Sequence, residues 1–146
     1  MSDQSSTPSS PARPNAQVVF DHERLDVYQE AVRLLVTADT LVEQLPPGRA
    51  YLADQLHRAS LSIVLNIAEG AGEFSPSEKA RFYRMALRSA TECAAIVDAS
   101  RALGVTDEPT ATLARQQLFA IVRMLSRMVQ NLKTRTPRKP RRNQVE

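Results

Sequence analysis

Apolar residues recur at alternating steps of three and four in four separate stretches of the chain. Steps that average about 3.5 residues place one apolar stripe on a helix and favour the shallow crossing angles of helix bundles. The pattern predicts four helices, over about residues 22–45, 49–70, 76–103 and 109–133, with ends good to about two to four residues. The stripes consist of Tyr28, Ala31, Leu35, Ala38, Val42 and Leu45; of Leu52, Leu56, Ala59, Ile63, Asn66 and Gly70; of Phe82, Ala86, Ser89, Cys93, Ile96, Ser100 and Leu103; and of Ala114, Leu118, Ile121, Leu125, Met128 and Leu132.

The ends of the predicted helices carry start and stop signals. Asp21 stands where it would cap the first helix. The segment 75–78 (Ser-Pro-Ser-Glu) has the form of a capping box, in which Ser75 caps the third helix and Glu78 reaches back to the cap amide. Gly104 suits the left-handed residue that ends a helix. Because the links are short, we expect an all-α, up-down antiparallel four-helix bundle.

The composition supports this fold class. Apolar residues make up 42% and charged residues 24% of the 146 residues, which is ordinary for a globular protein with a core. The chain has only four glycines and no tryptophan, whereas a β-sandwich or barrel would need more turn glycines and aromatic strand residues. We expect a disordered Ser/Pro-rich tail (1–19), the bundle (20–132) and a disordered basic tail (133–146).

Several features predict a reducing, cytoplasmic location without membrane association. Cys93 is the only cysteine, so no internal disulfide or cysteine metal cluster can form, and a lone cysteine in an apolar pattern is typical of a core. The N-terminus lacks the basic-then-apolar layout of a signal peptide. The longest uncharged stretch of the predicted helices, 59–68, has ten residues, whereas a membrane-spanning helix needs roughly 20.

Sequence signatures of catalysis are weak. His22 and His57 have no partner at metal-ligand spacing, and the Glu-x-x-His pair of di-iron bundles is missing. The segment 70–72 (Gly-Ala-Gly) lacks both the lysine and the preceding strand of a phosphate loop. Neither a serine nor the cysteine has a recognisable base partner. We therefore expect no enzymatic activity, no metal and no cofactor.

The second predicted helix is apolar on most of its circumference. Between residues 59 and 68 its only polar side chains are Ser60, Ser62 and Asn66. A helix of this kind is buried on more than one side. We expect that the second buried side is a subunit interface; a tightly wrapped monomer is the alternative.

A polar seam follows the remaining face of this helix. Its members recur at steps of three or four and therefore lie on one side. Because an unpaired buried charge is costly, we expect Arg58 to pair with Glu69 or with Glu92 of the third helix. A hydrogen-bonded network that fixes helix register and subunit contacts is favoured over a buried catalytic or ligand-binding carboxylate. The seam consists of Gln55, Arg58, Ser62, Asn66 and Glu69.

Charge is distributed unevenly along the chain. Residues 20–108 contain 9 basic and 14 acidic side chains, whereas residues 109–146 contain 9 basic and 1 acidic. Such a basic region attracts phosphate backbones with a salt-dependent affinity, and the third helix adds Arg81, Arg84 and Arg88. The candidate nucleic-acid-binding residues are Arg115, Phe119, Arg123, Arg127, Lys133, Arg135, Arg138, Lys139, Arg141 and Arg142.

Other interpretations of these residues stay open. The arginines can be a solvated face, and Phe119 can be a contact between protomers. The sequence has no helix-turn-helix or zinc-finger signature, so structured RNA, recognised by shape and backbone, is favoured over a DNA groove. The alternative function is a protein–protein scaffold whose basic tail is solvated or binds the partner.

Three segments of the chain resemble a known family. They are residues 20–29, 54–63 and 66–70, and the last two contain the string Arg-Ala-x-x-Ser-Ile…Asn-Ile-Ala-Glu-Gly. They are similar to the four-helix-bundle proteins first noticed as reading frames in intervening sequences of bacterial 23S ribosomal RNA genes. The resemblance continues through the third helix and covers roughly residues 20–130, which is essentially the whole bundle.

The resemblance implies an up-down bundle that assembles as a ring-like pentamer and has no catalytic activity. A related branch includes the accessory protein of diversity-generating retroelements, a basic pentamer that binds a reverse transcriptase and its template RNA. Arg88 stands where the family often has a small residue, and residues 20–108 are net acidic, unlike the accessory branch. RNA contacts are therefore expected on the fourth helix and the tail. The family's recurring residues correspond to Arg58, Ser62, Asn66, Glu69, Gly70, Ser89 and Glu92.

Overall fold

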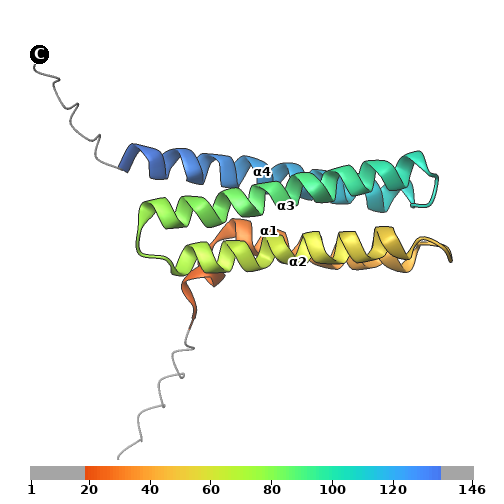
Figure 1. Ribbon diagram of the computed structural model, residues 1–146, viewed down its shortest axis with the longest axis horizontal. Coiled ribbons are helices and arrows are strands. Elements are labelled where there is room, and N and C mark those ends of the chain that lie inside the picture. Colours follow the sequence, from red (N-terminus) through yellow and green to blue (C-terminus); the bar gives the residue numbers. More distant parts are fainter. Residues whose placement is uncertain (1–18, 136–146) are drawn as a thin grey trace, which may run out of the picture.

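The computed structural model describes residues 19–135, which form four long helices, one short 3₁₀ helix and no strand. The 3₁₀ helix η1 spans Asp21–Arg24, and the long helices are α1 (Asp26–Glu43), α2 (Ala50–Gly72), α3 (Pro76–Ala102) and α4 (Glu108–Arg135). Successive long helices run antiparallel in up-down order (Figure 1). The predicted all-α four-helix fold is confirmed, and each predicted helix end lies within four residues of the observed one.

The long helices form two layers, one of α1 and α2 and the other of α3 and α4 (Figure 1). The four long helices stand at the corners of a square in cross-section, and each packs against the two helices at adjacent corners. The diagonal partners, α1 with α3 and α2 with α4, have no Cα atoms within 8 Å of each other. The two pairs are called the α1–α2 layer and the α3–α4 layer below.

The helix ends follow some of the predicted signals and depart from others. Ser75 is the N-cap of α3, and its side chain accepts a hydrogen bond from the Glu78 amide at 3.5 Å. Glu78 does not complete the capping box, because its carboxylate accepts hydrogen bonds from Arg81 instead. Asp21 does not cap α1; it begins η1, and α1 starts after Leu25 without a side-chain cap. Gly104 has φ of 67°, the left-handed conformation predicted for the end of α3.

One core of buried side chains from all four long helices holds the bundle together. Most predicted stripe residues of α2 and α4 are buried, with Leu56, Ile63, Leu118, Ile121 and Leu125 at most 4% exposed, whereas Asn66, Met128 and Leu132 are half-buried. Burial of aliphatic side chains of this size stabilises a fold by roughly 1.5–3 kcal/mol each. The core is therefore the main source of stability for both layers.

In α1 and α3 the predicted stripe is buried in part: Ala31, Ala38, Ala86, Cys93 and Ser100 are buried as predicted, and at the positions between them a neighbouring residue is buried instead. Leu34 is buried where Leu35 was expected, and Val97 is buried where Ile96 was expected. Adjacent apolar residues offer two stripes about 100° apart on the helix, and only packing against the neighbours selects one. The other shifted pairs, buried residue first, are Val27 and Tyr28, Leu41 and Val42, Tyr83 and Phe82, and Ala90 and Ser89.

The two layers approach each other closely near the end of α2. A Cβ atom at Gly70 would lie 2.6 Å from Cε1 of Tyr83 on α3. The absence of a side chain at Gly70 thus lets the buried Tyr83 ring pack directly on the α2 backbone. Gly70, which the sequence placed in the stripe of the second helix and among the family's recurring residues, has a packing role here.

The predicted tails fall largely outside residues 19–135. Lys133 and Arg135, which the sequence assigned to the basic tail, belong to the last turn of α4. The remaining tail candidates, Arg138, Lys139, Arg141 and Arg142, lie outside the described residues. Within the described range, no helix has the length and apolar character needed to cross a bilayer.

Candidate nucleic-acid interface

Charge in the bundle is sorted by layer. The helices α1 and α2 together carry six acidic and two basic side chains, whereas α3 and α4 carry four acidic and ten basic ones. The basic residues of the third and fourth helices are distant in sequence, but the fold places these helices side by side (Figure 1). The α3–α4 layer is therefore the basic side of the bundle.

The candidate residues of α4 follow a row that winds around the helix. Arg115, Phe119, Arg123 and Arg127 are spaced by four, and each step of four turns the direction by about 40° beyond a full turn. Arg115 accordingly reaches α3, where it pairs with Asp98, while Arg127 borders the start of α1. The row is exposed throughout.

Several basic side chains of this layer form ion pairs with acidic neighbours. Arg115 pairs with Asp98, and the Arg101 guanidinium lies 2.9 Å from the Glu108 carboxylate. Arg81 lies 3.0 Å from the Glu78 carboxylate and also covers the Phe82 ring, at 4.5 Å from its centroid. These arginines have less charge available for a phosphate than the sequence count implies.

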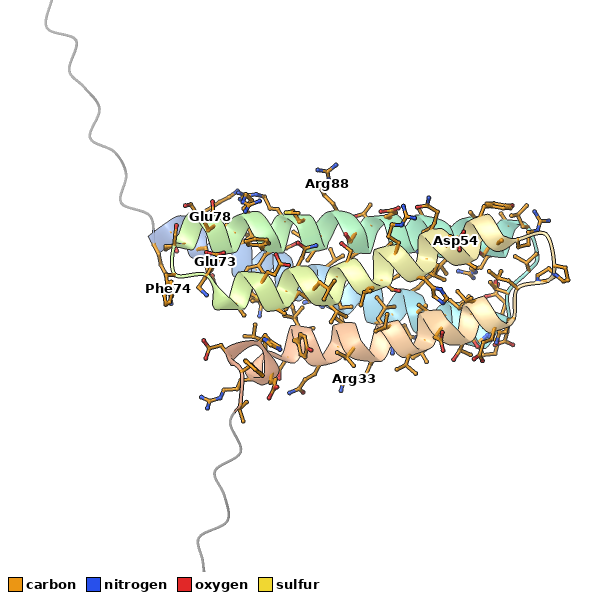
Figure 2. All side chains as sticks on the ribbon, turned by 60° about the horizontal axis from the view of Figure 1, so that its bottom comes forward. Arg33, Asp54, Glu73, Phe74, Glu78 and Arg88 are labelled. Atoms are coloured by element: carbon orange, nitrogen blue, oxygen red, sulfur yellow. The ribbon has the colours of Figure 1, made fainter. Side chains whose placement is uncertain are left out.

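Other basic side chains of the layer have no acidic partner among residues 19–135. In α4, Arg123 and Arg127 are exposed and take part in no ion pair of the described chain. In α3, Arg88 projects from the bundle, on the side opposite Arg33 of α1 (Figure 2). The exposed basic residues of the layer without an ion-pair partner in this range are Arg84, Arg88, Arg123, Arg127, Lys133 and Arg135.

Phe119 is the exposed aromatic residue of this surface. Its side chain is 65% exposed, although it lies in the middle of a long, well-packed helix. The Arg123 guanidinium lies 5.8 Å from the centroid of the Phe119 ring, within the range of a cation–π contact. The ring and the arginine thus form a combined flat and cationic surface.

A groove runs between the start of α1 and the C-terminal half of α4, and we call it the α1–α4 groove. Its volume is about 450 Å³. Its charged side chains, Asp26, Arg123 and Arg127, are exposed and form its rim. The apolar side chains that line it are Leu25, Val27, Ala120, Met124 and Met128.

The polar seam is only partly formed as predicted. Asn66 donates a hydrogen bond to Ser62 Oγ at 3.0 Å, and Ser89 of α3 donates to the same oxygen at 2.9 Å. This small network joins α2 to α3 across the boundary between the layers. The predicted pairing of Arg58 with Glu69 or Glu92 is wrong: none of the ion pairs in the described chain includes Arg58, because all three side chains point to solvent.

The α1–α2 layer carries apolar side chains that no other part of residues 19–135 covers. On α2, Leu61 is 45% and Leu65 is 50% exposed, at positions where the sequence indicated an extra apolar face. The neighbouring α1 adds exposed Val32 and Val36, which sequence reasoning missed. Their spacing of four along α1, away from its core stripe, is the signal that would have found them.

Phe74, in the turn between α2 and α3, was also missed. It is 99% exposed and extends from the end of the bundle (Figure 2). The sequence around Phe74, which is followed by Ser75 and Pro76, indicates a turn. It does not indicate whether the aromatic side chain is buried or exposed.

Two side chains with reactive groups, Cys93 and Tyr83, are buried in the core. Burial, and secondarily the charge of Glu92, raise the pKa of the Cys93 thiol to about 12, so the thiol stays protonated at neutral pH. Burial also raises the pKa of Tyr83. Residues 19–135 contain no group of three or more His, Cys, Asp or Glu side chains arranged to hold a metal ion.

The fold and the sequence strings together define a class of small four-helix bundles. A family description, "23S rRNA-intervening sequence protein", matches residues 23–127, which include all of α1, α2 and α3 and most of α4. The chain belongs to this family. A comparison with curated proteins gave no significant match.

Proposed function

We propose that this protein is a non-catalytic, self-associating bundle of the cytoplasm that binds structured RNA or a ribonucleoprotein. The basic α3–α4 layer and the C-terminal tail supply the contacts to phosphate. The observation that supports this most strongly is the set of exposed arginines on that layer without an ion-pair partner among residues 19–135, of which Arg123 also lies beside the exposed ring of Phe119. The intervening-sequence family to which the chain belongs is consistent with a role near RNA.

The physical basis is the release of counterions from the RNA backbone. Each phosphate that a basic side chain neutralises frees condensed cations, so the affinity falls steeply as salt rises. Arg123 and Arg127 are suited to this contact because no carboxylate of the described chain competes for them. Arg101 and Arg115 are less suited, because Glu108 and Asp98 already hold them.

Fluorescence anisotropy of a labelled RNA hairpin, measured across a salt series, tests this proposal. Replacing Arg123 and Arg127 together by glutamine should weaken binding by about a hundredfold at about 0.1 M salt and lower the salt slope by about two. The matched control replaces Arg101 and Arg115 by glutamine, with the same change in net charge, and should weaken binding much less. Equal losses in the two variants, or no binding by the unaltered chain at low salt, would contradict the proposal.

A second candidate function is a protein–protein scaffold, or an accessory subunit such as that of a reverse transcriptase, without direct contact to nucleic acid. The exposed Leu61 and Leu65 of α2, together with the exposed Val32 and Val36 of α1, favour a protein contact on the α1–α2 layer. We assign this surface to self-association, and the family resemblance suggests a pentamer. Co-purification of one protein partner that survives ribonuclease treatment, without RNA binding by the isolated chain, would favour the scaffold function.

A further inference from the structure

The α1–α4 groove combines an apolar floor with charges of opposite sign on its rim. Val27 at its base is only 2% exposed, whereas Arg123 and Arg127 on the α4 side and Asp26 on the α1 side are exposed. A volume of about 450 Å³ is larger than one aliphatic side chain needs. The groove therefore suits a flat apolar group that carries an anion on one side and N–H donors on the other.

Arg123 connects this groove to the ring of Phe119. It lines the groove and also lies 5.8 Å from the centroid of the ring. One step of four residues along a helix advances about 6 Å, so Phe119, Arg123 and Arg127 follow one another at regular intervals. Along α4 the exposed ring of Phe119 is therefore followed by two arginines that both line the groove.

We propose that this part of α4 binds two adjacent unpaired nucleotides of an RNA loop. Phe119 stacks on one base, the α1–α4 groove takes the next base, and Arg123 and Arg127 contact the phosphates. The inference rests on the proposed function and names the kind of RNA that the basic layer recognises.

An exposed ring and a groove contribute little to the binding of a duplex. In a double helix both faces of each base are covered, and a basic surface alone is enough to hold the backbone. Unpaired bases in loops can be splayed out and stacked on aromatic side chains, with arginines beside them to hold the strand. The surface of α4 has both of these parts.

Asp26 sets the orientation of the nucleotide in the groove. A carboxylate repels a phosphate but accepts hydrogen bonds from the amino group of a base. Because Asp26 stands on the α1 side and the arginines on the α4 side, the phosphate lies toward α4 and the edge of the base toward α1. This arrangement of charges favours a nucleotide over an aliphatic side chain as the bound group, because an aliphatic side chain would leave Asp26, Arg123 and Arg127 without a partner.

The test uses the full chain and an RNA hairpin with 2-aminopurine at an unpaired loop position. A second hairpin carries the same fluorescent base in its stem, and a fully paired duplex has the same number of phosphates. Saturating protein should change the fluorescence of the loop probe and leave the stem probe unchanged. The hairpin should bind more tightly than the duplex.

Two variants test separately whether the Phe119 ring and the α1–α4 groove contribute to hairpin binding. Phe119→Ala should weaken hairpin binding by about tenfold, the typical loss of one base–aromatic stack, and leave duplex binding unchanged. Ala120→Leu, which fills the groove without changing the charge, should weaken hairpin binding several-fold. Leu113→Ala is the matched control, because Leu113 is a 46% exposed apolar residue on the same helix, and it should bind as the unaltered chain does.

Three results would overturn the inference, and they separate it from the proposed function. Equal affinity for hairpin and duplex that depends on Arg123 and Arg127 but not on Phe119 would leave the RNA function standing without the nucleotide site. Absence of binding to either RNA would overturn both. A drop in native mass on Phe119→Ala or Phe74→Ala, with RNA affinity unchanged, would show that the groove receives the exposed Phe74 of a second copy instead.

Discussion

The α1–α2 layer and the α3–α4 layer build one core together but differ in what they present to solvent. The α1–α2 layer is net acidic and exposes aliphatic side chains such as Leu61, Leu65 and Val36. The α3–α4 layer is net basic and exposes arginines together with Phe119. The inner faces of the two layers are alike because both pack into the same apolar core. The outer faces are not constrained in this way, so their differences indicate which partners each layer binds.

The difference assigns separate tasks to the two layers. Uncovered aliphatic side chains favour contact with another protein surface, and unpaired arginines favour a polyanion. A chain with both on opposite sides can associate through one layer and keep the other open for RNA. The following changes test this division, beginning with the largest expected effect.

Charged residues on the α1–α2 layer should break self-association. Replacing Leu61 and Leu65 together by aspartate is expected to weaken it by about a hundredfold or more, because a charge in an apolar interface removes its strongest contacts. Light scattering over a concentration series should show the mass fall toward the 16.2 kDa of one chain. Leu113→Asp on α4 is the control and should leave the mass unchanged; an unchanged mass in the double variant would refute the role of this layer.

The junction between the layers should be sensitive at Gly70 and tolerant at Gly72. A methyl group at Gly70 meets the Tyr83 ring at 2.6 Å, while one at Gly72 meets nothing within 4 Å. Because Gly→Ala improves helix propensity at both positions, the difference between the variants reports the clash, about 1–3 kcal/mol in the free energy of unfolding. Urea denaturation followed by circular dichroism measures it, and equal stability of the two variants would disprove the close approach.

Of these changes, loss of the hydrogen bond between Ser62 and Ser89 should have the smallest effect, a small decrease in the free energy of unfolding. It joins α2 to α3 at 2.9 Å, and both side chains are half-buried. A double-mutant cycle with alanine at each position should give a coupling energy of about 0.5–1.5 kcal/mol, the usual net value of such a bond. Zero coupling would mean that this bond does not hold the layers in register.

The fold was accessible from the sequence because its periodic apolar pattern is long and repeated. The pattern located all four helices, and Gly104 marked the end of α3 correctly. The sequence could not show which of two adjacent residues of α1 or α3 faces the core, because neighbours such as Leu34 and Leu35 are both apolar. Choosing between them requires the positions of the other helices.

The candidate surface was predictable as a set of charges but not as an arrangement. The number of basic residues in α4 follows from the sequence. The ion pair of Arg115 with Asp98, in contrast, depends on a contact between different helices. The α1–α4 groove joins residues 25–27 to residues 120–128, which no local pattern connects. The predicted pairing of Arg58 failed because helical spacing places side chains on one face without showing whether the face is buried.

Ultraviolet cross-linking of the full chain to an RNA hairpin, followed by mass spectrometry of the tryptic peptides, tests the division between the layers most directly. The peptide 116–123, which contains Phe119, should carry the strongest RNA adduct, with further adducts on α3 peptides that contain Arg84 or Arg88. Peptides of α1 and α2 should carry few. Adducts concentrated on the α1–α2 layer, with none on the peptide of Phe119, would contradict the assignment of RNA to the basic layer.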